Sequence, residues 1–316
     1  MKLVACIFLL VTLFAAAQPS APTGFALQTI NTMPSPSTTG VPAGTTLTNY
    51  TGSCSITVNN TVIDSKTLNC TVEIRAQNVT IRNSQITGSI EIYTDEGIFT
   101  GGSANNSLLI EDSRIIGPST TTYFTGVDGV GEKNWVARRI HVTGFRRQMH
   151  CLRNCTLEHS LLHQVSTVSS PETEPTATHQ SAIRGGPNFT LRGNVIHCDA
   201  PDVGEAGCSS NLTIYNAWGP QHDILIEGNY FPASTAGYCT YGGDSHNTPD
   251  SYNVIFRNNY YGRRGKGNSV PASAGSENGG PTCGYYGSSS AFTPGRPGNV
   301  WTNNVYVPDG GTVVGQ

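Results

Sequence analysis

The chain has 316 residues, a formal net charge of −3 at pH 7 and only 12% charged residues, against roughly 25% in an ordinary soluble domain. Its 36 glycines and 18 prolines are abundant, whereas the helix-favouring residues Glu, Lys and Arg are scarce. This composition argues against a helical bundle, a coiled coil or a helix-rich α/β fold. A weakly acidic chain also lacks the positive charge of nucleic-acid-binding proteins. We therefore expect an all-β protein with no nucleic-acid partner.

Residues 1–17 have the pattern of a secretory signal peptide. Lys2 supplies the positive charge, residues 3–14 form a short apolar run, and residues 15–17 are the small alanines of a cleavage site. The run is too short to span a membrane, and no later stretch approaches ~18 apolar residues. We predict a secreted, extracellular and monomeric protein with no membrane partner.

Of the nine cysteines, Cys6 would leave with the signal peptide, so the mature chain would keep eight. An even number of cysteines in an exported protein favours disulfides. We predict that they pair in sequential order, as Cys54–Cys70, Cys151–Cys155, Cys198–Cys208 and Cys239–Cys283. A zinc site made of His150, Cys151 and Cys155 is the weaker interpretation, because its spacing is poor and its thiols would be oxidised.

A repeated pattern runs through the chain. Each repeat has a polar start, alternating apolar residues, a small polar residue and further apolar residues. The repeats cover residues 78–86, 107–115, 135–142, 154–162, 188–196, 223–231, 253–261 and 299–306. Apolar residues alternate with a period of two inside each repeat, which is typical of β-strands. The distance between repeats varies, which indicates coils that tolerate insertions of different length.

When the repeats are aligned, one column is almost entirely small and polar. It reads Ser84, Ser113, Ile140, Ser160, Asn194, Asn229, Asn259 and Asn304. In a parallel β-helix, successive coils stack about 4.8 Å apart, so these side chains could bond to one another as an inward polar ladder. A β-sandwich also has many short strands, but it gives no reason for this column. The pattern therefore favours a single parallel β-helix.

A second set of strand-like segments lies between the repeats, at residues 90–93, 126–128, 149–152, 181–184, 212–215, 238–241 and 283–286. Four of them end in a large residue that is followed by Gly or Asn. If the coils stack, these large residues form a ridge on one face of the molecule. They are Arg184, Tyr215, Tyr241 and Tyr286.

The repeats at residues 59–306 resemble, in their form only, the right-handed parallel β-helix superfamily of secreted pectate-lyase-like proteins. The resemblance implies an extracellular polysaccharide partner and, most often, lyase or hydrolase chemistry, although a fold does not fix one reaction. We expect an N-terminal leader or cap at residues 18–50, the β-helix at residues 51–307, with disulfides that clip its loops, and a C-terminal tail at residues 308–316.

The residues favour a lyase over a hydrolase. The motifs of polygalacturonase-type hydrolases are absent, and the carboxylate pairs Asp128 with Glu132 and Asp244 with Asp250 are not specific for hydrolysis. A lyase must neutralise the carboxylate of a uronic acid and then remove the C5 proton. Arg, Lys or a calcium ion can neutralise the carboxylate. No cofactor is certain, a calcium ion is possible, and the ligands of any metal are unknown.

One strand-like segment offers both parts of a lyase site. Arg184 could bind a carboxylate through two hydrogen bonds, and His179, at the entrance of the segment, could be the base. Tyr241 on a nearby coil could donate a proton or stack on a sugar ring. The alternative is that Arg184 is a surface residue that bonds a loop and that His179 is a polar turn residue.

We further predict a group of substrate-binding residues around this segment. It consists of Arg146, Arg147, His150, Tyr215, Asp244, His246 and Tyr286. The Arg-x-Pro-x-x-Arg pattern of pectate lyases is absent, which argues against a pectate lyase of the usual kind. We therefore predict a secreted lyase that cleaves a uronic-acid polysaccharide by β-elimination. The alternatives are a β-helix glycoside hydrolase and a non-catalytic extracellular glycan-binding or structural protein.

Overall fold

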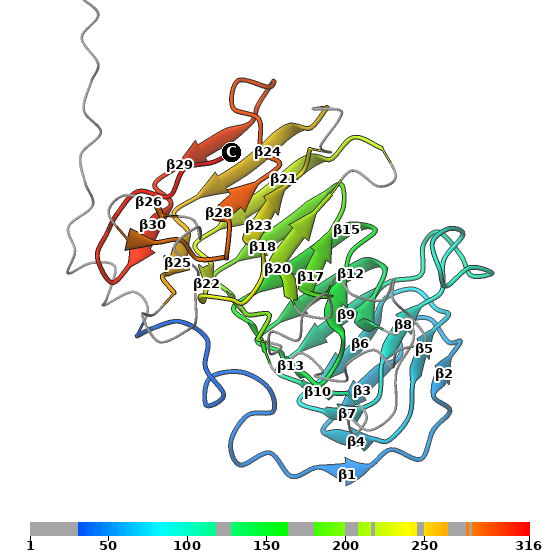
Figure 1. Cartoon of the computed structure of the whole chain (residues 1–316). Coiled ribbons are helices and arrows are strands. Elements are labelled where there is room, and N and C mark those ends of the chain that lie inside the picture. Colours follow the sequence, from blue (N-terminus) through cyan, green and yellow to red (C-terminus); the bar gives the residue numbers. More distant parts are fainter. Residues whose placement is uncertain are drawn as a thin grey trace, which may run out of the picture.

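The computed structural model of the protein describes residues 31–117, 128–163, 180–199, 208–215, 219–244, 250–264, 276–277 and 280–316. Within these ranges the chain consists of strands, turns and irregular segments, with no helix. The described part of the chain contains no helix that is long and apolar enough to cross a membrane. The strands wind into a stack of coils that climbs from β1 at one end to β30 at the other (Figure 1).

Three long sheets, here called A, B and C, form the walls of the coil (Figure 1). Sheet A contains β1 (Thr48–Asn49), β4 (Lys66–Leu68), β7 (Gln85–Thr87), β10 (Arg114–Ile116), β13 (His141–Thr143), β16 (Leu161–Leu162), β19 (Val195–Ile196), β22 (Tyr230–Phe231), β25 (Tyr260–Gly262) and β30 (Val305–Val307). Sheet B contains β2 (Ser55–Ile56), β5 (Val72–Ile74), β8 (Ile90–Ile92), β11 (Asp128–Gly131), β14 (Arg147–His150), β17 (Gln180–Gly185), β20 (Cys208–Ile214), β23 (Tyr238–Gly242) and β28 (Gly287–Ser290).

Sheet C contains β3 (Val62–Asp64), β6 (Val79–Arg82), β9 (Leu108–Glu111), β12 (Lys133–Arg138), β15 (Arg153–Glu158), β18 (Phe189–Arg192), β21 (His222–Glu227), β24 (Tyr252–Arg257) and β29 (Val300–Thr302). A small antiparallel pair, β26 (Ser276–Glu277) and β27 (Gly280–Pro281), stands apart from the walls. Neighbouring strands within each wall are parallel and belong to successive coils. The predicted parallel β-helix is therefore confirmed, and a β-sandwich of antiparallel strands is excluded.

The core of the coil is made of side chains stacked in register. On sheet C one inward position is fully buried in seven consecutive coils, as Ile81, Ile110, Ala137, Leu157, Leu191, Ile226 and Phe256. Burying a large aliphatic or aromatic side chain stabilises a fold by about 1.5–3 kcal/mol. This is the alternation that the repeats display in the sequence, since every second residue faces inward.

The predicted polar ladder exists at the corner between sheets C and A. The Asn194 side-chain amide donates to Asn229 Oδ1 at 2.9 Å, and Asn229 donates in the same way to Asn259 at 3.1 Å. Each of these amides also donates to a backbone carbonyl of the coil wall. The residue before each ladder position has a positive φ, as in Asn83, Asp112, Arg139, His159, Gly193, Gly228, Asn258 and Asn303. Asn, Asp and Gly tolerate this left-handed conformation best, which explains their recurrence in the repeats.

All four predicted disulfides are confirmed. They join Cys54 to Cys70, Cys151 to Cys155, Cys198 to Cys208, and Cys239 to Cys283. Each disulfide has at least one cysteine in a sheet B strand or next to one. The cross-links therefore fix sheet B, and they indicate an oxidising compartment.

Candidate functional site

A pocket of about 260 Å³ opens beside the middle strands of sheet B. Its lining includes His150 from β14, Arg184 from β17 and Tyr215 just after β20. The starts of two sheet C strands complete the wall with Arg153 and His222. Pockets for drug-sized ligands occupy ~300–1,000 Å³. A pocket of this smaller size suits one sugar unit or its carboxylate group.

Arg184 lies in this pocket and forms no ion pair with a described residue, although the Asp128 charge partly opposes the lowering of its pKa. It sits in register with His150 on one side and Thr213 on the other. Burial and the positive charge of Arg147 both lower the pKa of Arg184. A partly desolvated guanidinium is stabilised when it receives an anion, and a carboxylate can bind it through two parallel hydrogen bonds. The pocket therefore has the electrostatics of a carboxylate-binding site.

A buried charged cluster lies directly beside Arg184. Asp128 and Glu132 are each 3% exposed and His150 is 8% exposed. Arg147 Nη2 donates to Asp128 Oδ2 at 2.8 Å, and its Nε donates to the other carboxylate oxygen. Although burial opposes ionisation, Arg147 and His150 together hold the pKa of Asp128 below its usual range. Arg147 therefore serves as the counter-ion of Asp128 and does not line the pocket.

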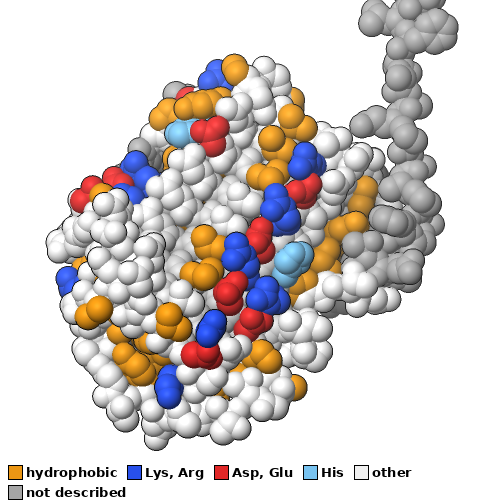
Figure 2. Space-filling view, turned by 180° about the vertical axis from the view of Figure 1, so that it is seen from behind, with side chains coloured by type: hydrophobic (Ala, Val, Ile, Leu, Met, Phe, Trp, Pro, Cys, Tyr) orange, Lys and Arg blue, Asp and Glu red, His pale blue; other side chains and the backbone are white. Residues whose placement is uncertain are grey.

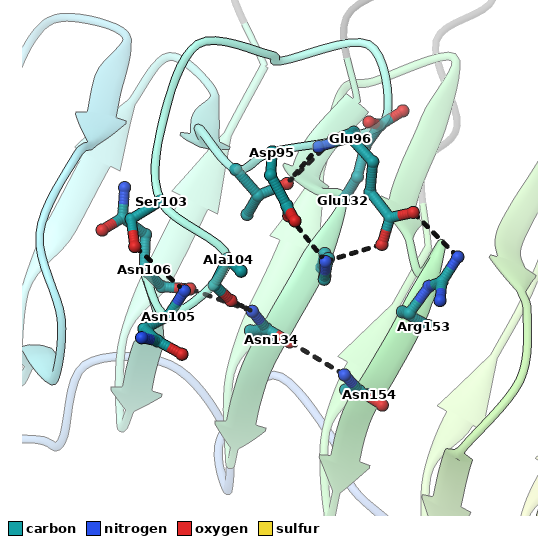
Figure 3. Close-up of polar contacts among 12 residues, drawn as sticks. Asp95, Glu96, Ser103, Ala104, Asn105, Asn106, Glu132, Asn134, Arg153 and Asn154 are labelled. Carbon is teal, nitrogen blue, oxygen red and sulfur yellow. Dashed lines mark hydrogen bonds and ion pairs between the residues drawn. The ribbon is translucent and has the colours of Figure 1, made fainter.

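The loop between β8 and β9 covers this cluster. The backbone N–H of Ile98 donates to Glu132 Oε2. Lys133 is held by Asp95 at 3.0 Å and Glu96 at 2.6 Å, and Arg153 binds Glu96 at 2.9 Å. Figure 3 shows the loop residues Asp95 and Glu96 above the start of β12, which Glu132 immediately precedes. These contacts anchor the loop, so that Glu132 is shielded from solvent.

Tyrosine rings continue the surface beyond the pocket. Tyr215 and Tyr241 meet edge to face with their ring centroids 6.4 Å apart. Tyr238 contacts Tyr241 at 5.6 Å and Tyr286 at 6.0 Å. Aromatic faces of this kind suit the apolar faces of sugar rings. Burial raises the pKa of Tyr241.

The predicted ridge differs in detail from the observed arrangement. Arg184 is in register with Thr213 and Tyr241, which places Tyr215 two residues beyond that row. Tyr241 pairs with Ser290, and Tyr286 precedes β28. The prediction of a strand at residues 283–286 is therefore wrong, because these residues form a turn that precedes β28. All four large residues still belong to sheet B or to the loops at its ends.

The remaining predicted residues lie elsewhere or outside the described residues. His179 and His246 fall outside the described ranges. Asp244 is 2% exposed and its Oδ1 accepts a hydrogen bond from the Ser251 backbone, so it fixes a turn and does not line the pocket. Arg146 is partly buried next to Arg147 and is also absent from the pocket lining.

Asp128 and Glu132 could not be associated with His150 from the sequence. Each of the three residues offers one possible metal-ligand atom, and these atoms lie within 4.8 Å of one another. The two carboxylates precede His150 by about one coil, so only the register of the β-helix brings them together. Arg153 and His222 were missed for a similar reason, because they enter the pocket from the neighbouring sheet.

No known protein family matches the chain, and no curated protein or solved structure is significantly similar to it. The site must therefore be interpreted from its own geometry.

Proposed function

We propose that the protein is a secreted enzyme of the pectate-lyase-like β-helix superfamily that cleaves a uronic-acid polysaccharide by β-elimination. The observation that carries the proposal is the half-buried Arg184, which lines a sugar-sized pocket without a carboxylate partner among the described residues. The tyrosines beyond the pocket add support, because they extend the same face along the coil axis.

In β-elimination a base removes the C5 proton of the uronic acid. The electron pair of the C5–H bond forms a C4=C5 double bond, and the C4–O bond to the neighbouring sugar breaks. The leaving oxygen takes a proton from an acid. The reaction is slow in water because negative charge develops on the carboxylate in the transition state, so a cation placed there accelerates it.

We assign the carboxylate of the substrate to Arg184. The base remains the sequence-based assignment to His179, which precedes β17 by one residue. We assign protonation of the leaving oxygen to Tyr215 in place of Tyr241, because Tyr215 lines the pocket. We assign Tyr241 to the stacking of a neighbouring sugar, because it does not line the pocket and keeps its ring against Tyr215.

Hydrolysis by Asp128 and Glu132 is the second candidate. Their candidate oxygens lie within 4.8 Å of each other, near the ~5–5.5 Å spacing of retaining glycosidases. However, Asp128 is bound by Arg147 through both oxygens, and Glu132 is bound by the covering loop. Carboxylates that are buried and engaged in this way cannot reach a polymer on the surface, so elimination is the better proposal.

The test is to incubate the secreted protein with a panel of uronic-acid polysaccharides and follow the ultraviolet absorbance of unsaturated products. We expect Arg184→Ala to lower the rate by about 100-fold or more, the usual loss when one charge-stabilising donor is removed. Arg184→Lys should recover only part of the rate, since lysine cannot bind a carboxylate in the same bidentate way.

Arg192→Ala is the matched control, because Arg192 lies on sheet C and is paired with carboxylates there. It should leave the rate unchanged. Reducing ends without unsaturated products would replace elimination by hydrolysis. Retention of a glycan without any product, unchanged in Arg184→Ala, would indicate a binding protein whose contact surface lies elsewhere.

A further inference from the structure

The cluster of Asp128, Glu132 and His150 is arranged so that three ligand atoms converge. Arg147 binds both oxygens of the Asp128 carboxylate, and the Ile98 backbone N–H donates to Glu132 Oε2. Asp128 Oδ2, which also accepts the hydrogen bond from Arg147 Nη2, lies 3.3 Å from His150 Nδ1, and Glu132 Oε1 lies at the same distance from it.

His150 Nδ1 is a buried nitrogen without a hydrogen-bond partner in the described part of the structure. Its residue is only 8% exposed, and the two facing oxygens, although 3.3 Å away, do not meet the geometry of a hydrogen bond. Most buried polar atoms have a partner, so an orphaned nitrogen between two carboxylates needs an explanation. A cation at the centre of the three atoms would satisfy all of them.

From this geometry we infer that Asp128, Glu132 and His150 form a binding site for a zinc ion. A tetrahedral ion with bonds of about 2.0–2.1 Å keeps its ligand atoms roughly 3.3–3.4 Å apart, which matches the two nitrogen–oxygen distances of 3.3 Å. When His150 is neutral, as a metal ligand must be, the two buried carboxylates of the cluster are balanced only by the Arg147 guanidinium. A divalent cation therefore also compensates charge that burial makes costly.

The donor set distinguishes zinc from calcium. Calcium prefers six to eight oxygen ligands at ~2.3–2.6 Å, whereas imidazole nitrogen is a typical ligand of zinc and other late transition metals. The hydrogen bonds from Arg147 and Ile98 orient the two carboxylates, as the partners of metal ligands commonly do. The three protein ligands leave a fourth position open, which is the arrangement of catalytic zinc sites. Because His150 also lines the Arg184 pocket, the ion would increase positive potential where we place the substrate carboxylate.

The test measures metal binding without polysaccharide, so it is independent of the proposed lyase activity. The full-length secreted protein is stripped with a chelator and titrated with Zn²⁺ by calorimetry. We expect one equivalent to bind, and an equal concentration of Ca²⁺ not to displace it. Glu132→Gln should weaken binding by about 100-fold or more, since changes to the partners of ligands alone cost 10–100-fold.

Glu91→Gln is the matched control, because Glu91 is a sheet B carboxylate one coil away that is in register with Gly131. It should bind Zn²⁺ like the natural chain. Co²⁺ loaded into the unaltered protein gives a readout that does not depend on whether variants fold. We expect the intense visible absorption of a four-coordinate ion with a nitrogen ligand.

Three results would overturn the inference: no stoichiometric Zn²⁺ binding to the unaltered chain, equal binding by folded Glu132→Gln, or displacement by an equal concentration of Ca²⁺. Failure of polysaccharide cleavage would contradict the proposed function and leave the metal measurement intact.

Discussion

Sheets B and C carry charged residues in two different ways. On sheet C, a row of alternating acidic and basic side chains runs across the outer face (Figure 2). Each member bridges successive coils, as when Arg192 binds Glu158 at 3.0 Å and Glu227 at 3.2 Å. On sheet B, by contrast, Arg184 has no carboxylate partner among the described residues and the neighbouring Asp128–Glu132 cluster is buried.

The pairing of charged residues on the two sheets has different consequences for stability. The sheet C pairs are partly exposed and balanced in charge, so each contributes only ~0.2–1 kcal/mol to stability. The sheet B charges lie in a low-dielectric environment with incomplete pairing, which costs stability and is typical of functional sites. The disulfides beside sheet B offset part of this loss of stability, because cross-links lower the conformational entropy of the unfolded chain.

The largest effect on stability is expected from the buried pair on sheet B. Arg147→Ala leaves the Asp128 carboxylate buried without its main counter-ion, and breaking a buried pair in this way costs about 3–5 kcal/mol. The measurement is the free energy of unfolding from urea titration. A loss below ~1 kcal/mol, the size typical of an exposed pair, would remove the distinction between the two walls.

The disulfides should differ from one another by their loop length. Cys239 and Cys283 are separated by 44 residues, so replacing both with Ala should cost about 4 kcal/mol. Cys151 and Cys155 are separated by only 4 residues, and their replacement should cost about 2 kcal/mol by the same relation. Thermal melting of the two double variants compares these costs. Equal losses would show that local packing, and not chain entropy, sets the stabilisation.

A pair of histidines on sheet A should make the stability of the protein fall at acidic pH. His141 Nε2 lies 2.8 Å from His163 Nε2, so one ring must accept a hydrogen bond and stay neutral. Burial, with the charges of His163 and Arg114, lowers the pKa of His141 from 6.5 to about 4. The unfolded chain therefore binds a proton that the folded chain does not, and stability falls as the pH drops from about 6.5 to about 4. His141→Gln should flatten this part of a melting-temperature profile, whereas an unchanged slope would place its origin elsewhere.

The smallest effect is expected on sheet C. The Arg192 side chain is 44% exposed although it binds two carboxylates. Arg192→Ala should therefore cost less than about 1 kcal/mol, and added salt should reduce the difference further. Urea unfolding at low and high salt measures it. A loss as large as that of Arg147→Ala would mean that the ladder is a major source of stability.

The fold was predictable because it repeats. Small polar residues recur at one position of nearly every repeat from Ser84 to Asn304. In a β-helix the equivalent positions of successive coils stack, so these side chains contact one another. The disulfides followed from the order of the cysteines and the compartment. The fold follows from a periodic pattern and the disulfides follow from cysteines close in sequence, so neither prediction requires knowledge of contacts between distant residues.

The site was predictable only in part, because it depends on contacts between coils. The sequence pointed to Arg184 and to the tyrosines, but it misplaced Tyr286 relative to its strand. It predicted His150 as a substrate-binding residue, and His150 does line the pocket, but the sequence did not show that His150 Nδ1 faces two buried carboxylates from the preceding coil. Such contacts depend on the exact register between neighbouring coils. Because the spacing between the repeats varies, the sequence does not determine that register.

The mass of the product tests the central claim most directly. A uronic-acid polymer that is cleaved by β-elimination gives a new fragment one water lighter than the same fragment from hydrolysis. We predict the lighter, unsaturated fragment from the unaltered protein and its loss in Arg184→Ala. A fragment that has gained water, or an unsaturated fragment that forms equally fast in Arg184→Ala, would contradict the account.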